Sequence, residues 1–185
     1  GELRMTVEEA QRDMRHGMLG GFMGQLVSAI LWFASAVLAT WGSERWAIAL
    51  LVVAGFFIFP LTKLGLLLIG HRAGVSKENP LNALGMQAAF VLPLSLLLVT
   101  AAALYRLEWF YPAFMIVLGA HYLPFVTLYG MKMFYVLAGV LVSAGVLLAL
   151  YVTMPFATGA WITAAVLTFF AFLGRARVAS EMAVS

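Results

Sequence analysis

The sequence contains no cysteine and few charged residues, and each of these absences excludes whole classes of protein. Without cysteine, the chain has no disulfide scaffold, no thiol nucleophile and no cysteine-ligated metal site. Charged residues make up 10% and hydrophobic residues 64% of the 185 residues, whereas soluble domains have about 25% and about 45–50%. A net charge of +3 is too small an excess to indicate binding to nucleic acid. The composition therefore predicts an integral membrane protein whose main partner is the lipid bilayer.

Motifs for catalysis, cofactors and metal ions are also missing. No acidic residue lies inside the apolar runs, which excludes the paired carboxylates of glycosidases and aspartic proteases at membrane depth. The three histidines, His16, His71 and His121, lie in different segments without a metal-ligand spacing. The chain also lacks a Gly-x-Ser-x-Gly elbow, a P-loop and a dinucleotide fingerprint. We therefore expect no cofactor and no metal, and we assign no catalytic residue.

Long apolar runs separated by short polar connections make up most of the chain. A membrane helix needs about 20 apolar residues. Six runs are candidates: Gly17–Thr40, Ala47–Gly70, Leu81–Leu104, Phe110–Leu128, Met133–Tyr151 and Ala160–Phe172. The sequence predicts an all-α integral membrane protein with six transmembrane helices arranged as three hairpins. The expected parts are an amphipathic N-terminal segment (1–16), a six-helix transmembrane domain (17–173) and a C-terminal tail (174–185).

Lys and Arg residues are concentrated on one side of this predicted bundle. The opposite side has only Arg45 and Arg106, whereas the first side has Arg4, Arg12, Arg15, Arg72, Lys77, Lys132, Arg175 and Arg177. Cytoplasmic loops carry an excess of Lys and Arg, so this bias predicts that both termini and their tails are cytoplasmic. The expected location is a plasma or inner membrane.

The residues before the first apolar run carry a helix-start signal. Thr6 and Glu9 have the spacing of a capping box, in which each side chain bonds the backbone of the other. Val7, Ala10 and Met14 then recur at helical spacing. This pattern predicts a short interfacial helix that leads into the first span.

A shift of 64 residues brings several distinctive residues into register. Glu44 then matches Glu108, and Pro60 matches Pro124. One interpretation is a parallel duplication of the first two hairpins, because repeats are common in transporter folds. The alternative is that any two helical hairpins of similar length can be aligned in part.

Four glycines in the first apolar run form two overlapping GxxxG patterns. Small residues at this spacing let a second helix approach closely. The pattern predicts tight packing inside the bundle, and a homo-oligomer seam is the alternative. The residues are Gly17, Gly20, Gly21 and Gly24.

Prolines interrupt the second, third and fourth runs, at Pro60, Pro93 and Pro124. Each proline removes one helical hydrogen bond and frees the carbonyl four residues back. In lipid such a carbonyl needs an internal partner or a wet cavity. We therefore predict three kinks in consecutive spans.

Lys63 and His121 are the only ionisable residues well inside the runs, and such residues are functional candidates by default. Gln25 and Gln87 lie at a similar depth, and Thr127 lies in the same half. We expect these five side chains to form a pocket open to the cytoplasm. Because no acid lies nearby, an anionic solute or lipid headgroup would be the counter-ion of Lys63. The alternatives are that Lys63 snorkels to the headgroups and that His121 is a neutral, hydrogen-bonded residue.

The function that these features favour is a channel or transporter-like bundle, with a homo-oligomer as the alternative to a single chain. Its inner-leaflet site would bind a small anionic solute or a lipid headgroup. Two other functions stay open. One is a structural or assembly protein without transport activity, which a dry, fully packed interior would favour. The other is a membrane-embedded enzyme that modifies a lipid, with His121 or Lys63 as its acid–base group.

Overall fold

The structure, a computed structural model, describes residues 5–184, and within that range the chain forms helices and turns without a strand. Residues 1–4 and 185, which include Arg4 and the two ends of the predicted terminal segments, lie outside it. Five helical segments are long and apolar enough to cross a membrane, or six if α3 and α4 form one bent span. The predicted all-α class is confirmed for the described residues, with five or six candidate membrane-spanning helices. The helices are α1 (Val7–Met18), α2 (Phe22–Trp41), α3 (Glu44–Gly55), α4 (Ile58–Leu68), α5 (Asn82–Tyr105), α6 (Phe110–Tyr129), α7 (Met133–Leu150) and α8 (Thr158–Val184), with 3-10 turns η1 (Leu19–Gly21) and η2 (Leu107–Trp109).

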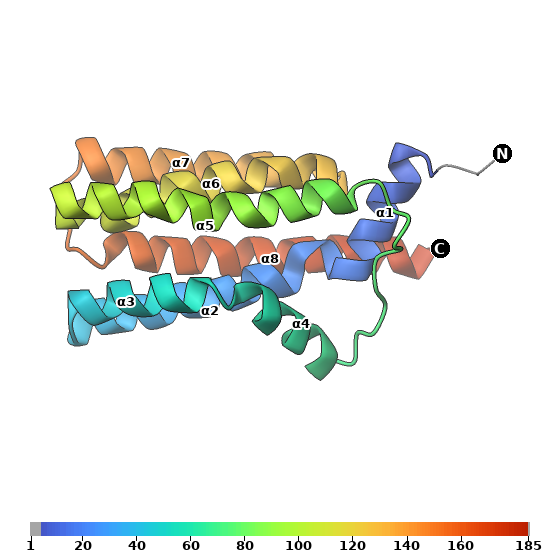
Figure 1. The fold of residues 1–185 in the computed structure, drawn as a ribbon, viewed down its shortest axis with the longest axis horizontal. Coiled ribbons are helices and arrows are strands. Elements are labelled where there is room, and N and C mark those ends of the chain that lie inside the picture. Colours follow the sequence, from blue (N-terminus) through green and yellow to red (C-terminus); the bar gives the residue numbers. More distant parts are fainter. Residues whose placement is uncertain (1–4, 185) are drawn as a thin grey trace.

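The helices form two layers joined by α8. One layer holds α5, α6 and α7, and the other holds α2 with α3 and α4 packed on it (Figure 1). Helix α8 contacts both α2 and α7, so it connects the layers. Helix α1 lies across one end of the bundle, and the C-terminal end of α8 lies at the same end (Figure 1).

Large aromatic side chains fill the centre between α2 and α6. Trp32 is fully buried and packs edge-on against Phe114, with ring centroids 4.8 Å apart. One turn further along α2, the Ser35 hydroxyl lies 2.6 Å from the Tyr111 hydroxyl. These contacts fix the antiparallel register of α2 and α6.

The N-terminal helix begins as the sequence predicts. The Thr6 backbone N–H donates to Glu9 Oε2 (2.7 Å), and the Glu9 N–H donates to Thr6 Oγ1 (3.2 Å). The predicted continuation into the first span differs, however. Leu19, Gly20 and Gly21 all have positive φ, of 51°, 62° and 80°, so the chain turns between α1 and α2.

The second predicted span is broken into α3 and α4, which are bent by 70° relative to each other. Pro60 lies in the first turn of α4. Because proline has no N–H to donate to the Phe56 carbonyl, the series of α-helical hydrogen bonds stops at Phe56. Phe56 and Phe57 instead bond to carbonyls three residues back, at 3.2 and 2.9 Å. Proline therefore marks a real break here.

The other two prolines do not break their helices. Pro93 lies inside α5 and Pro124 inside α6, and both helices continue past them. Pro60 and Pro124, which the 64-residue shift aligns, therefore occupy different positions: one follows a sharp bend and the other lies in an unbroken helix. The expected equivalence of these two kinks is wrong, and the duplication is not confirmed.

The last helix is longer than the sequence predicts. Helix α8 has 27 residues and continues to Val184, through most of the segment expected to be a tail. At 1.5 Å per residue it is about 40 Å long, more than the hydrocarbon core of about 30 Å. Its length therefore exceeds what one crossing along the membrane normal requires.

Candidate functional site

Basic side chains surround a hollow at the end of the bundle where α1 crosses. The hollow has a volume of about 400 Å³ and is referred to below as the basic hollow. Its side chains come from α1, the α6–α7 connection and the last turns of α8. It is lined by Arg15, Gly130, Met131, Lys132, Arg177, Val178 and Glu181.

Arg15 is held on one side of the basic hollow by three hydrogen bonds. Its Nε donates to Glu181 Oε2 (2.9 Å) and its Nη2 donates to Glu181 Oε1 (2.6 Å). Its Nη1 donates to the Tyr129 carbonyl (2.7 Å), near the end of α6. The guanidinium thus joins three helices and neutralises the one acid in the lining.

Local sequence features place the other two cations. Gly130 has a φ of +64°, which ends α6 in the left-handed conformation that glycine adopts readily, and the chain then turns into α7. Lys132 is the N-cap residue of α7. Arg177 precedes Glu181 by four residues on α8, so the two lie on one face of that helix.

Arg15 also affects the protonation of the acid that it contacts. Its hydrogen bonds lower the pKa of Glu181 below the ordinary value of 4.5, more than the partial burial of the carboxylate raises it. Glu181 is therefore ionised at neutral pH. Even so, the lining of the basic hollow holds three cations and one anion.

The structure does not bring the five predicted ligand residues together. Lys63 is exposed on α4 and its ammonium lies 4.7 Å from the centroid of the Phe59 ring. Gln87 and Thr127 are also exposed. Helix α4 packs on α2, away from the layer that contains His121 (Figure 1). The expected pocket that joins Lys63 to His121 is thus not formed by this arrangement, and the basic hollow contains none of the five.

Two of the five do have buried polar atoms. Gln25 is 1% exposed, and neither its amide oxygen nor its amide nitrogen has a hydrogen-bond partner among the described residues. His121 packs against the rings of Tyr122 and Phe125, beside the backbone of Ala88, and its Nδ1 likewise has no partner in the described part of the chain. Gln25 lies on α2, whereas His121 lies on α6 beside the Ala88 backbone of α5.

The four glycines pack closely, but not along one helix face. A Cβ on Gly17 would lie 2.8 Å from Val75, and one on Gly20 would lie 2.9 Å from Val178. Gly20 and Gly21 lie in the turn between α1 and α2, so the predicted continuous GxxxG stripe is wrong. Gly20 and Gly21 thus pack closely in a sharp turn rather than along a helix–helix seam.

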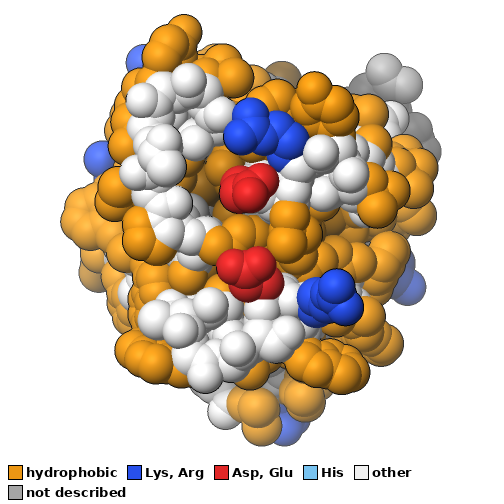
Figure 2. Space-filling view, turned by 90° about the vertical axis from the view of Figure 1, so that its left-hand side faces the viewer, with side chains coloured by type: hydrophobic (Ala, Val, Ile, Leu, Met, Phe, Trp, Pro, Cys, Tyr) orange, Lys and Arg blue, Asp and Glu red, His pale blue; other side chains and the backbone are white. Residues whose placement is uncertain are grey.

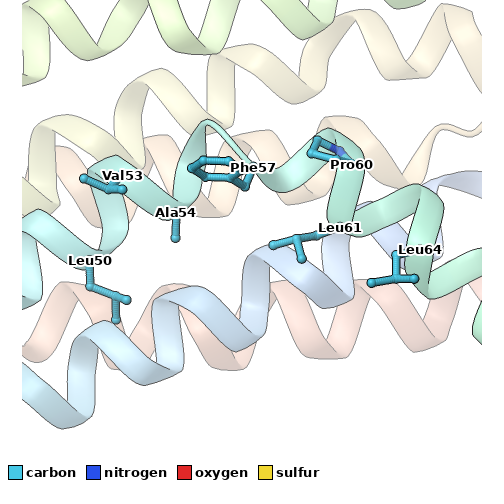
Figure 3. A pocket seen from close by; sticks show the side chains of 7 residues that line it. All are labelled: Leu50, Val53, Ala54, Phe57, Pro60, Leu61 and Leu64. Atoms are coloured by element: carbon cyan, nitrogen blue, oxygen red, sulfur yellow. The ribbon is translucent and has the colours of Figure 1, made fainter.

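A second hollow, of about 480 Å³, lies in the elbow between α3 and α4 (Figure 3). It offers a ligand no polar side chain. An apolar hollow on a membrane helix suits an acyl chain better than a polar solute. Its lining residues are Leu50, Val53, Ala54, Phe57, Pro60, Leu61 and Leu64.

The opposite end of the bundle carries few charges of either sign. Its exposed charged residues are Glu44 and Arg45 at the start of α3, and Arg106 and Glu108 in the α5–α6 connection. Figure 2 shows the acidic side chains near the middle of this face and the basic ones beside them. This balance contrasts with the excess of positive charge around the basic hollow.

Sequence reasoning missed the basic hollow because its residues come from three segments far apart in the chain. The available signal was the charge bias, which assigned Arg15, Lys132 and Arg177 to one side. Glu181 gave no local signal, because its role depends on the docking of α1 against α8.

Comparison with known proteins gives a family and no further relative. No curated protein and no solved structure matches the chain. A family model matches residues 7–176, which include the helices α1 to α7 and most of α8. Because this match extends over most of the sequence, the chain belongs to the family described as "Family of unknown function (DUF7010)".

Proposed function

We propose that the protein is a transporter-like membrane bundle that binds an anionic group, from a small solute or a lipid headgroup, in the basic hollow. The observation that carries this proposal is the unbalanced charge of the lining. Arg15 and Glu181 satisfy each other, but Lys132 and Arg177 form no ion pair within the described residues. An anion that contacts both of them would relieve their repulsion. Arg in particular recognises phosphate and carboxylate groups through paired hydrogen bonds.

The start of α7 adds backbone donors to the same place. Within the described chain, no hydrogen bond is found from the backbone N–H groups of Met131, Lys132 and Met133. Two of these residues line the basic hollow. The N-terminus of a helix carries a partial positive charge and free N–H groups, and both favour an anion. The charge of the side chains and the helix dipole therefore act in the same direction.

The position of the basic hollow fits the headgroup region of the inner leaflet. Both described ends of the chain lie at this end of the bundle, which requires an even number of crossings. Six crossings follow if α3 and α4 together make one broken span. With the excess of Lys and Arg on this side, the proposed orientation has both termini in the cytoplasm of a plasma or inner membrane. Anionic lipids of that leaflet attract basic residues near its surface.

The broken span supports a transport role over a purely structural one. Discontinuous helices at membrane depth are typical of transporters, in which unwound backbone is tolerated where it lines a path. The Phe56 carbonyl at the break accepts no hydrogen bond within the described residues. A movable α4 would give this carbonyl a role during transport.

Thermal unfolding of the purified protein with added anions tests the binding. Phosphatidylglycerol should raise the Tm more than phosphatidylcholine does if the anion is a lipid headgroup. Inorganic phosphate should raise it more than chloride at equal ionic strength if the anion is a free solute. The Lys132→Gln, Arg177→Gln double variant should lose this selectivity, whereas Arg106→Gln at the opposite end should keep it. Equal anion-dependent shifts in the wild type and the double variant would exclude the site.

Uptake into proteoliposomes tests the transport role separately. If the anion is a free solute, labelled phosphate should accumulate in vesicles that contain the wild type, and uptake should fall in the double variant. The protein could bind the anion but neither take up phosphate nor move labelled phosphatidylglycerol between leaflets. That result would remove the transport role and leave a protein that only binds the solute or the lipid.

A further inference from the structure

Gln25 is a buried amide that the bundle does not satisfy. It lies on α2, one turn from the break at Gly21, and is 1% exposed. No described residue donates to its oxygen or accepts from its nitrogen. A buried polar group without a partner is costly, and in lipid it has no access to bulk water. Such a group in a native protein points to a bound molecule that supplies the missing bonds.

The contacts between α2 and α6 place Gln25 in the interior. Ser35 bonds Tyr111 at the outer end of the pair, and a Cβ on Gly21 would lie 3.2 Å from the Tyr129 ring at the other end. Between Gln25 and Ser35 along α2, the ring of Trp32 packs against the ring of Phe114 on α6. Along α2, Gln25 thus lies between Trp32 and the turn to α1, the helix that crosses this end of the bundle (Figure 1).

No ionised side chain is buried in this interior. The buried polar residues in the described range are neutral: Gln25, Ser28, Ser35, Thr62, Asn79 and Thr163. A charged ligand would therefore lack a counter-charge there. A small neutral molecule with both a donor and an acceptor would satisfy the two ends of the amide.

Helix α1 has the features of a hinged cover over this region. The three consecutive positive φ angles at Leu19, Gly20 and Gly21 form a turn at which the direction of the chain can change. Asn79 Nδ2 donates to the Ala10 carbonyl (2.9 Å) and to Asp13 Oδ2 (2.8 Å), which ties α1 to the segment before α5. Toward α6 and α8, a second set of polar contacts holds α1 down: Arg15 on Glu181 and Tyr129, and Gln11 Nε2 on the Thr127 carbonyl (2.8 Å). We call these contacts the latch. They are polar and are exposed or only partly buried, so they can exchange with water.

We propose that α1 is a lid over a buried site in which the Gln25 amide binds a small neutral solute with a hydrogen-bond donor and acceptor. When the latch opens, α1 turns about Leu19–Gly21 and the solute enters from the basic end. The lid and the Gln25 site do not depend on anion binding in the basic hollow, although Arg15 and Glu181 belong to both.

Thiol labelling tests the lid, because the chain has no cysteine of its own. Ser28→Cys places one thiol on the buried face of α2, one turn from Gln25, and methyl methanethiosulfonate is the reagent. Adding Glu181→Gln weakens the latch and should speed the labelling about tenfold, the effect of losing one charged hydrogen bond. Ala36→Cys, buried on the same helix beyond Trp32, should label at one slow rate with or without Glu181→Gln. Unchanged labelling of Ser28→Cys would overturn the lid.

Protection by acetamide tests the site itself. Acetamide has one amide donor group and one carbonyl acceptor, as the amide of Gln25 requires. It should slow the labelling of Ser28→Cys in the Glu181→Gln background, and a further Gln25→Leu change should abolish the protection. Protection that persists with Gln25→Leu, or no protection by acetamide, would overturn the Gln25 site even if the lid opens. Both results are read as ratios of labelling rates in folded, monodisperse protein.

Discussion

Arg15 and Glu181 are separated by 166 positions in the sequence, and the guanidinium of Arg15 donates two hydrogen bonds to the carboxylate of Glu181. The Arg15 side chain is 14% exposed and that of Glu181 33% exposed, so water screens the pair only in part. The contact fixes α1 against the last turns of α8. It therefore determines the shape of the basic hollow and the closed position of the lid.

Removing the guanidinium should destabilise the protein measurably. Arg15→Met should lower the free energy of unfolding by about 1–3 kcal/mol, because Glu181 and the Tyr129 carbonyl both lose a charged donor. The measurement is denaturant unfolding in detergent. Arg12 is the matched control, since it lies 3.9 Å from Glu181 and its side chain is 55% exposed. Arg12→Met should change the free energy by less than about 0.5 kcal/mol, and equal losses in both variants would contradict this view of the pair.

Acid should weaken the same contact. The hydrogen bonds from Arg15 lower the pKa of Glu181 in the folded state below its ordinary value of 4.5. A group with a lowered folded pKa stabilises the protein fully above its unfolded pKa, and the contribution disappears as the pH falls through the folded pKa. The Tm difference between the wild type and Glu181→Gln should be constant near neutral pH and shrink below about pH 4.5. A Tm difference between the wild type and Glu181→Gln that grows as the pH falls would contradict this prediction.

The sequence predicts features that depend on neighbouring residues in the chain. The capping box of Thr6 and Glu9 forms because its two bonds connect residues three positions apart. The break before Pro60 follows from the missing N–H of proline. Pro93 and Pro124 have the same chemistry but leave their helices continuous. Whether a proline breaks a membrane helix depends on how neighbouring helices pack, and the local sequence does not contain that information.

Depth in the membrane can be predicted from sequence position, but the direction of a side chain around its helix cannot be predicted when every face is apolar. Lys63 and Gln25 occur at similar predicted depths. Lys63 nevertheless lies exposed on α4, whereas Gln25 is buried on α2. The bend at Phe56 turns α4 outward, and this bend determines where Lys63 lies. The basic hollow escaped prediction for a related reason, since it exists only when α1 docks on α8.

Alanine substitutions should distinguish Gly20, which the turn between α1 and α2 requires, from Gly139, which lies inside a helix. Gly20 has a φ of +62°, and a Cβ there would lie 2.9 Å from Val178. Gly20→Ala should therefore cost about 1–3 kcal/mol from backbone strain and overpacking. Gly139 lies in the middle of α7 with open space around it, so Gly139→Ala should stabilise the protein by up to about 1 kcal/mol. Thermal unfolding of the two variants measures both effects, and shifts of the same sign would contradict the argument.

The Ser35–Tyr111 bond gives a final test, because the directions of its protons can be deduced. The Ser35 hydroxyl donates to the Ala47 carbonyl at 2.9 Å, so its single proton is used there. Tyr111 must then be the donor in the 2.6 Å contact between the two hydroxyls. Tyr111→Phe removes a donor and leaves Ser35 still bonded to Ala47, so it should cost about 0.6–1.7 kcal/mol, the range found for hydrogen bonds between membrane helices.

Ser35→Ala should cost more than Tyr111→Phe, because the buried Tyr111 hydroxyl keeps only a long contact of 3.4 Å to the Ser35 carbonyl. The double variant should then be more stable than the sum of the two single losses predicts, since it leaves no hydroxyl without its partner. Ser95→Ala is the control: its hydroxyl bonds only the Val91 carbonyl within α5, and its loss should be close to zero. Denaturant unfolding of the four proteins of the cycle gives the coupling energy. Strictly additive losses would show that the two hydroxyls do not stabilise the α2–α6 contact through each other.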